Sequence, residues 1–198
     1  MKTILALFSV AGCLFLTPAY ADFKNEKNRC EPDKNAKVEY ALAEASIDIE
    51  RAADSLERFD SRTKAKFKRW FGVASKTAII EVYDLFVKAE NLWEKQFLWC
   101  PDSRNGNGDY DNNKIAHVYL GNKYDIFISP AFFDLPASGE ESKASSILHE
   151  LMHLAGADLD PRTYSVQEAE HLARTNPRNA RRNAQNLEYF AIDIVFGM

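Results

Sequence analysis

The sequence predicts a single α+β domain that is mainly helical and carries a small antiparallel sheet. Apolar residues recur every three or four positions in two long stretches of the first half, as on amphipathic helices. Two short β-prone segments follow, and a later helical stretch holds the pattern HExxH. The 198 residues, 46% hydrophobic and 27% charged, are enough for one sizeable core. The sequence has no Gly-rich phosphate loop, strand–helix alternation or internal repeat, which disfavours nucleotide-binding folds.

The first 21 residues have the pattern of a signal peptide. Lys2 gives a positive start, residues 4–16 are almost wholly apolar, and Ala19 and Ala21 form a small-x-small cleavage site. We therefore expect residues 1–21 to be removed and residues 22–198 to form one secreted or periplasmic domain. The alternative is a lipid anchor on Cys13, because residues 10–13 resemble a lipobox, although the apolar Leu14 that follows argues against it. No other stretch is long and apolar enough to span a membrane.

The two remaining cysteines, Cys30 and Cys100, are most simply explained as one disulfide in an oxidising compartment. Two free buried thiols are the alternative. A zinc site is less favoured, since no CxxC spacing accompanies either cysteine.

Residues 22–100 are expected to form a helical half, with helices over residues 36–59 and 77–99. The basic run at residues 62–69 between them is interpreted as the solvated face of a helix beside the buried Trp70 and Phe71. A net charge of −4 and a pI near 5.6 give no electrostatic case for nucleic-acid binding. We expect a monomer.

Residues 101–198 are expected to hold the strands and the chemistry. Residues 105–113 are rich in Gly, Asn and Asp and predict an irregular loop. Residues 115–120 and 124–128 predict a hairpin, either strand of which offers an edge for an extended peptide.

The helix with the HExxH pattern is expected to start with a capping box of Ser138 and Glu141 and to end at Gly156, after four to five turns. His149 and His153 are four positions apart, so both imidazoles project from one face and can grip one ion. Glu150 is rotated by about 100°, which makes it a poor ligand but a good partner for a water molecule beside the ion. The pattern is short enough to arise by chance, with the histidines as ordinary core residues.

Segments on both sides of the motif carry a family pattern. They are residues 126–137, which include Pro-Ala-Phe and Leu-Pro-Ala, residues 157–160 (Ala-Asp-Leu-Asp), residues 172–177 (Leu-Ala-Arg-Thr-Asn-Pro), residues 183–191 (Asn-Ala-Gln-Asn-Leu-Glu-Tyr-Phe-Ala), and the upstream Arg69-Trp-Phe-Gly72 and Cys100. Together they resemble the deuterolysin and peptidyl-lysine metalloendopeptidase family, the aspzincins, over nearly the whole mature chain. The resemblance implies a zincin-like metallopeptidase domain with an HExxH active-site helix, one Zn²⁺ ion, and a peptide or protein substrate.

The resemblance also implies the remaining ligand and a transition-state donor. A catalytic zinc site needs three protein ligands and an open position. The family's Gly-Thr-x-Asp stands here as residues 157–160, so Asp160 is expected to be the third ligand, with Asp158 as the fallback. Tyr164 is expected to bind the oxyanion, although it follows Asp160 by four residues where the family has three. A gluzincin-like third ligand from the glutamates Glu168, Glu170 or Glu188 is the runner-up.

Substrate preference is expected to depend on Gln185 and Glu188. Lysine-specific relatives are thought to select lysine at P1′ with an Asp and a Glu at these positions. Because Gln185 is a neutral amide, we expect no strict lysine specificity. His117 and His171 are interpreted as structural or substrate-edge residues.

These expectations add up to a secreted zinc metalloendopeptidase that uses single-step hydrolysis, with Glu150 as the general base. An exported, zinc-stabilised binding protein that has lost turnover is the alternative, and so is a dedicated protease that acts on a single partner.

Overall fold

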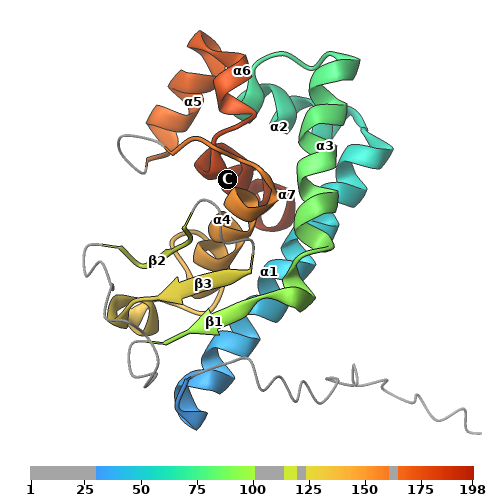
Figure 1. Ribbon diagram of the computed structural model, residues 1–198. Coiled ribbons are helices and arrows are strands. Elements are labelled where there is room, and N and C mark those ends of the chain that lie inside the picture. Colours follow the sequence, from blue (N-terminus) through green and yellow to red (C-terminus); the bar gives the residue numbers. More distant parts are fainter. Residues whose placement is uncertain (1–29, 101–113, 120–123, 161–164) are drawn as a thin grey trace, which may run out of the picture.

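The computed structural model describes residues 30–100, 114–119, 124–160 and 165–198. Helices α3, α4 and α7 pack against the long α1, α5 and α6 lie at the opposite end of the molecule from the start of α1, and a small sheet lies to one side (Figure 1). The expected signal peptide, its cleavage site and Cys13 lie outside the described residues. Within the described residues, no helix is both long and apolar enough to cross a membrane.

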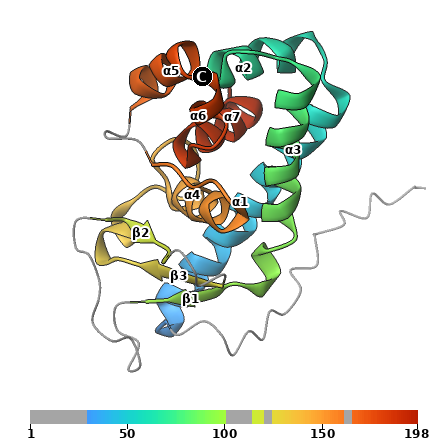
Figure 2. The ribbon, with the colours of Figure 1, turned by 45° about the horizontal axis from the view of Figure 1, so that its top comes forward.

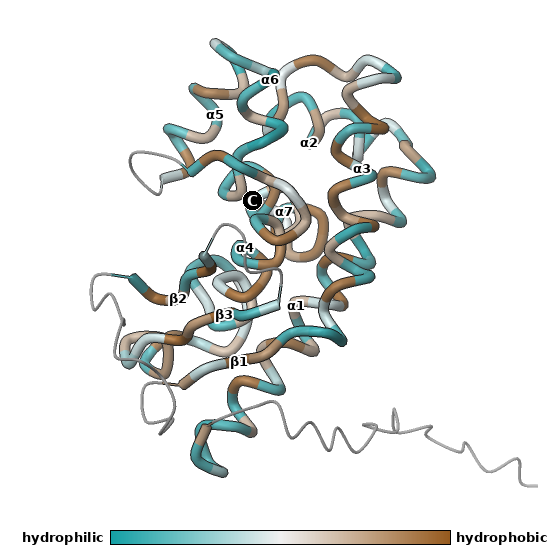
Figure 3. The backbone as a smooth tube through the Cα atoms, viewed as in Figure 1, coloured by the Kyte–Doolittle hydropathy of each residue, from teal (hydrophilic) through white to brown (hydrophobic). Residues whose placement is uncertain are grey.

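Helix α1 (Pro32–Arg58) has 27 residues and is the longest described helix, and its buried face packs against α3, α4 and α7. The predicted helix over residues 36–59 is confirmed but begins earlier, because Pro32 fits a first helical turn. Figure 3 shows hydropathy alternating along α1, as expected when one face of this helix is buried.

Helices α2 (Ser61–Phe71) and α3 (Lys76–Glu90) follow. The predicted helix over residues 77–99 is too long: α3 ends at Glu90, and a 3₁₀ turn, η1 (Trp93–Lys95), leads into strand β1 (Phe97–Trp99). The run Phe97-Leu98-Trp99 fits an apolar helix pattern as well as a strand. Its pairing with a distant strand decides the outcome, which a local pattern does not contain.

The sheet has the order β1-β3-β2, with β2 (Ala116–His117) and β3 (Asp125–Ile128). The predicted antiparallel pairing between the two segments of the hairpin is confirmed, although both strands are shorter than expected. The sheet as a whole is mixed and not antiparallel, because β1 runs parallel to β3. Leu98, Ile126 and Ile128 are fully buried, so one face of the sheet belongs to the core.

Helix α4 (Lys143–Ala155) begins later than predicted and has 13 residues, fewer than four turns. Its N-cap is Ser142, whose hydroxyl accepts from the backbone N–H of Ser145 while Ser145 Oγ accepts from the N–H of Ser142. The predicted capping box of Ser138 and Glu141 is therefore wrong, and Glu141 has φ 49° just before the cap. The predicted end of the helix at Gly156 is confirmed.

The remaining elements are the 3₁₀ helix η2 (Pro130–Asp134) and the helices α5 (Val166–Thr175), α6 (Pro177–Ala180) and α7 (Ala184–Phe196). Figure 2 shows α4 between the sheet and the C-terminal helices. Phe190 of α7 contacts aromatic rings from α2 and α3, namely Phe67, Phe71 and Phe86. These contacts pack α7 against α2 and α3.

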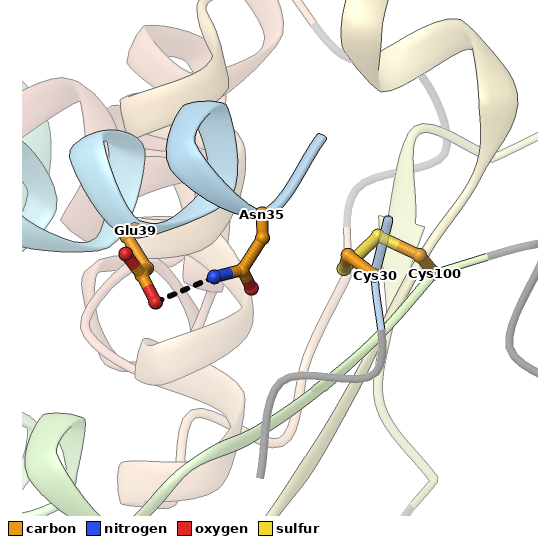
Figure 4. Close-up of a disulfide and its surroundings, with 4 residues drawn as sticks. All are labelled: Cys30, Asn35, Glu39 and Cys100. Atoms are coloured by element: carbon orange, nitrogen blue, oxygen red, sulfur yellow. Dashed lines mark hydrogen bonds between the residues drawn. A yellow bond between two sulfur atoms is a disulfide. The ribbon is translucent and has the colours of Figure 1, made fainter. Parts of the chain in front are cut away.

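The predicted disulfide between Cys30 and Cys100 is confirmed, and it joins the residues just before α1 to the end of β1 (Figure 4). Near it, Asn35 Nδ2 donates to Glu39 Oε1 at 2.7 Å on the first turns of α1. The disulfide therefore ties the sheet to the start of the longest helix.

Candidate metal centre

Helix α4 brings His149 and His153 together on one face, as their spacing predicts. Their ring centroids are 4.9 Å apart. His149 is only 7% exposed, because α7 covers it, whereas His153 is partly exposed near the end of the helix. Two imidazoles thus point to one place from successive turns.

Asp160 reaches the same place because the chain reverses after α4. Gly156 has φ 116°, a left-handed conformation that glycine adopts without strain, and the N–H of Ala157 donates to the carbonyl of Met152 at 2.9 Å. Leu159 then forms a β-bridge with Asn183 at the start of α7. These contacts hold the segment that ends at Asp160 against α4.

The three side chains form a compact group. Asp160 Oδ1 lies 2.9 Å from His153 Nε2 and 3.2 Å from His149 Nε2. A tetrahedral zinc ion with bonds of about 2.0–2.1 Å sets its ligand atoms roughly 3.3 Å apart, so only small adjustments separate this arrangement from a zinc site. Among the described residues, this is the group of His, Cys, Asp and Glu side chains whose ligand atoms are close enough to share a metal ion. The donor set fits zinc.

The electrostatics of the group also favour a cation. Burial disfavours a charged His149, but Asp160 and Glu188 outweigh it and raise the pKa of His149 to about 10. Hydrogen bonds from His149 and His153 hold the pKa of Asp160 well below its usual range. The side chain of Asp160 is about half exposed, so one side of the site remains open to solvent.

The alternative ligands lie elsewhere or have other partners. Asp158 accepts a hydrogen bond from Arg182 Nε at 2.9 Å, and Glu170 accepts one from Arg69 Nε at 2.7 Å. Glu168 lies on α5 outside the metal-ligating group, and so does the exposed His171. Glu188 contacts only Nδ1 of His149, at 3.1 Å, whereas Asp160 contacts Nε2 of both histidines.

Glu150 lies in the same cavity and is 7% exposed. Burial raises its pKa, although His149 and His153 act in the opposite direction. It stands next to His149 in the chain but is turned away from the ligand face of α4. The carboxylate is therefore beside the candidate ligands without being one of them.

The cavity has a volume of about 560 Å³ and lies between β2 with its flanking residues, α4 and α7. Gln185 and Glu188 line it from α7, together with Tyr189. His117 lines it from β2 and stacks on Phe127, with ring centroids 5.2 Å apart. Tyr164 lies outside the described residues, so its expected role stays a prediction.

The sequence does not indicate several of the residues that line the cavity. These are Lys114, Glu141, Ser145 and Ser146. The sequence also did not indicate that Glu188 lies 3.1 Å from His149 Nδ1, because the two residues are 39 positions apart.

Comparison with known proteins identifies relatives of this amino-acid sequence. The sequence model of the Aspzincin_M35 family, described as lysine-specific metallo-endopeptidase, matches residues 57–192. An extracellular protease of Aeromonas hydrophila is 28% identical over 168 residues, which cover 82% of this chain and 45% of that protein. A peptidyl-Lys metalloendopeptidase of Pleurotus ostreatus is 26% identical over 166 residues, which cover 82% of this chain and 93% of that protein. The chain thus spans about half the length of the first relative and nearly all of the second.

The fold has a counterpart among solved structures. A zinc peptidase from Grifola frondosa superimposes with a TM-score of 0.71 at 21% identity, covering 83% of this chain and 97% of that one. This likeness supports the mainly helical fold with a small mixed sheet. Since the family model also extends over more than half of the sequence, the chain belongs to the Aspzincin_M35 family.

Proposed function

We propose that the chain is a secreted, zinc-dependent endopeptidase. The observation that carries the proposal is the convergence of His149, His153 and Asp160 in a cavity that also holds the buried Glu150. The spacing of the three ligand atoms fits a single zinc ion. The side chain of Asp160 is about half exposed, so the site is open to solvent, which can supply a fourth ligand.

The two histidines and Asp160 would hold the metal through His149 Nε2, His153 Nε2 and Asp160 Oδ1. A zinc ion in such a site supplies Lewis acidity, which lowers the pKa of a water molecule and polarises a peptide carbonyl. The Nδ1 nitrogen of each histidine faces an acceptor, which leaves Nε2 to bind the metal. His153 Nδ1 donates to the Ala157 carbonyl at 2.6 Å, and His149 Nδ1 lies 3.1 Å from Glu188 Oε2.

Glu150 acts as the general base. Burial raises the pKa of its carboxyl, which lines the cavity beside the candidate ligands, where it can accept a proton from water and return it. It takes a proton from the attacking water and passes it to the leaving amine, so no covalent intermediate is needed. Tyr164 would donate a hydrogen bond to the oxyanion, by analogy with the family.

The substrate is an extended peptide or protein chain. Strand β2 lies at the edge of the sheet and contributes Ala116 and His117 to the cavity wall, so a peptide can pair along it. Gln185 and Glu188 line the same cavity from α7 and are the candidate P1′ contacts. With one neutral amide in this pair, we propose a P1′ preference that is not restricted to lysine. Initial rates on peptides that differ only at P1′ test this, and cleavage before lysine alone would contradict it.

The test of the activity compares zinc content and casein hydrolysis for the wild type and Glu150→Ala. The wild type should hold one zinc ion and cleave casein, and the variant should hold zinc with little cleavage. A wild type without zinc would contradict the enzyme proposal, whereas full activity in the variant would contradict only the role of Glu150. Bound zinc without hydrolysis over a broad peptide library would instead favour a zinc-stabilised binding protein or a protease dedicated to one partner.

A further inference from the structure

We propose that Glu188 is a positioning residue for the metal ligand His149, and that Gln185 braces Glu188 in this role. The inference rests on the metal site of the proposed function but not on its hydrolytic activity. Glu188 Oε2 lies 3.1 Å from His149 Nδ1, on the side of the ring opposite to the nitrogen that faces Asp160. One imidazole thus joins Glu188 to the ligand group.

The contact selects one form of the His149 ring. A carboxylate accepts hydrogen bonds, so it favours the tautomer with hydrogen on Nδ1 and leaves the Nε2 lone pair for a metal. Glu188 and His149 are 6% and 7% exposed, so little water competes for the bond. His153 receives the same kind of support from the backbone carbonyl of Ala157, whereas the support of His149 depends on a side chain.

Gln185 holds the carboxylate in place. It lies one turn before Glu188 on α7, is 5% exposed, and donates from Nε2 to Glu188 Oε2 at 2.8 Å. Both bonds therefore end on the same oxygen of Glu188, which points that oxygen at His149. A carboxylate at position 185 would have no hydrogen to donate and would repel Glu188, so the amide is suited to the brace.

Helix α7 supports the metal ligands at two points. Asn183 Oδ1 accepts from the N–H of Asn186 and caps the helix. At the same end, the N–H of Ala184 donates to the Leu159 carbonyl at 3.1 Å, one residue before Asp160. The start of α7 thus holds the segment of Asp160, and the next turn orients His149 through Glu188. The inference gives Glu188 a role beyond contact with the substrate.

The experiment measures zinc affinity by competition with a chromophoric chelator. We expect Glu188→Ala to bind zinc about 10–100-fold more weakly than the wild type, which is the usual effect of losing such an outer partner. Glu188→Gln keeps an acceptor oxygen, so its zinc affinity should lie between those of the wild type and Glu188→Ala. Gln185→Met, which removes the donor at similar volume, should weaken binding by a smaller factor. The visible spectrum of the cobalt-substituted protein should shift in the same order, because it reports ligand geometry.

Glu141→Gln is the matched control, since it makes the same chemical change at another residue that lines the cavity. Its zinc affinity and cobalt spectrum should stay unchanged. Should Glu188→Ala fail to fold, as judged by circular dichroism, Glu188→Gln and Gln185→Met decide the question. Folded variants that match the wild type in both readouts would overturn the proposal. A wild type that binds zinc but cleaves no peptide would contradict the hydrolase alone and leave this result intact.

Discussion

At the scale of single residues, the site depends on the choice among several acids. Asp158 and Asp160 both line the cavity and both follow the turn at Gly156. Asp160 contacts both histidines, whereas Asp158 is bound by Arg182. A carboxylate already paired with a guanidinium has less to gain from a metal, so the pairing of Asp158 favours Asp160 as the ligand.

Asp160→Asn should weaken zinc binding by more than about 100-fold, because it removes a charged ligand and outer partners alone are worth about 10–100-fold. Asp158→Asn is the matched control and should stay within a few-fold of the wild type. Chelator competition on both proteins checks this. The reverse order of the two affinities would assign the ligand to Asp158.

At the scale of elements, the end of α4 and the turn after it bring His149, His153 and Asp160 together. The left-handed Gly156 turns the chain back, so that the residues after the helix lie beside its last turns. A Cβ at this position would meet Leu85 Cδ2 at an ordinary 3.7 Å, so an alanine is disfavoured by backbone conformation and not by a clash. The conformation of Gly156 therefore helps to bring Asp160 to the histidines, together with the bridge between Leu159 and Asn183.

Gly156→Ala should cost about 1–2 kcal/mol of stability, the usual penalty for a side chain in the left-handed region. If the segment shifts to relieve this strain, zinc affinity should fall by roughly 5–30-fold. Gly139→Ala is a control with similar backbone strain, since Gly139 has φ 96° and open space around its Cβ position. Equal zinc affinities for both variants, at equal loss of stability by urea denaturation, would show that the turn does not position Asp160.

At the scale of the whole molecule, a partly buried ion pair between Lys66 and Asp193 joins α2 to the last helix, α7. Asp193 of α7 is 2% exposed, lies 2.6 Å from Lys66 Nζ and accepts from Trp70 Nε1 at 2.9 Å. The basic run that contains Lys66 was predicted to be a solvated face. The structure corrects this for Lys66 and for Arg69, which binds Glu170 and the Met198 carbonyl. The partners lie more than a hundred positions away, so no local pattern contains them.

Asp193→Ala should cost roughly 1.5–3 kcal/mol at pH 7, because it removes the charged acceptor of Lys66 and Trp70, while Lys66, with 12% of its side chain exposed, keeps the backbone carbonyl of residue 193. Burial disfavours the charge of Asp193, but hydrogen bonds from Lys66, the Met198 N–H and Trp70 outweigh it and hold the pKa below 3.8. The stabilisation is therefore complete above pH 3.8 and is lost as the pH falls through the lower pKa of the folded state. Urea denaturation at several pH values checks this. A difference between the two proteins that does not shrink in acid would contradict the assignment.

The sequence predicts local features of this fold well and distant ones poorly. The spacing of His149 and His153, the end of the helix at Gly156 and the Cys30–Cys100 disulfide follow from local chemistry or from cysteine count, and the structure has each of them. Strand β1 and the contact of Glu188 with His149 depend on residues far apart in the chain. Asp160 contacts both histidines, but its spacing from His153 is not a helical one, so in the sequence only the family resemblance points to it as a ligand.

The most direct test of the central claim is removal and return of zinc. After chelation the protein should cleave no peptide, and activity should return in proportion to added zinc and level off at one ion per chain. Glu150→Gln should take up zinc with the same stoichiometry and regain almost no activity, because it keeps the ligands but cannot accept the proton. Cleavage by the metal-free wild type, or full recovery by Glu150→Gln, would contradict the account.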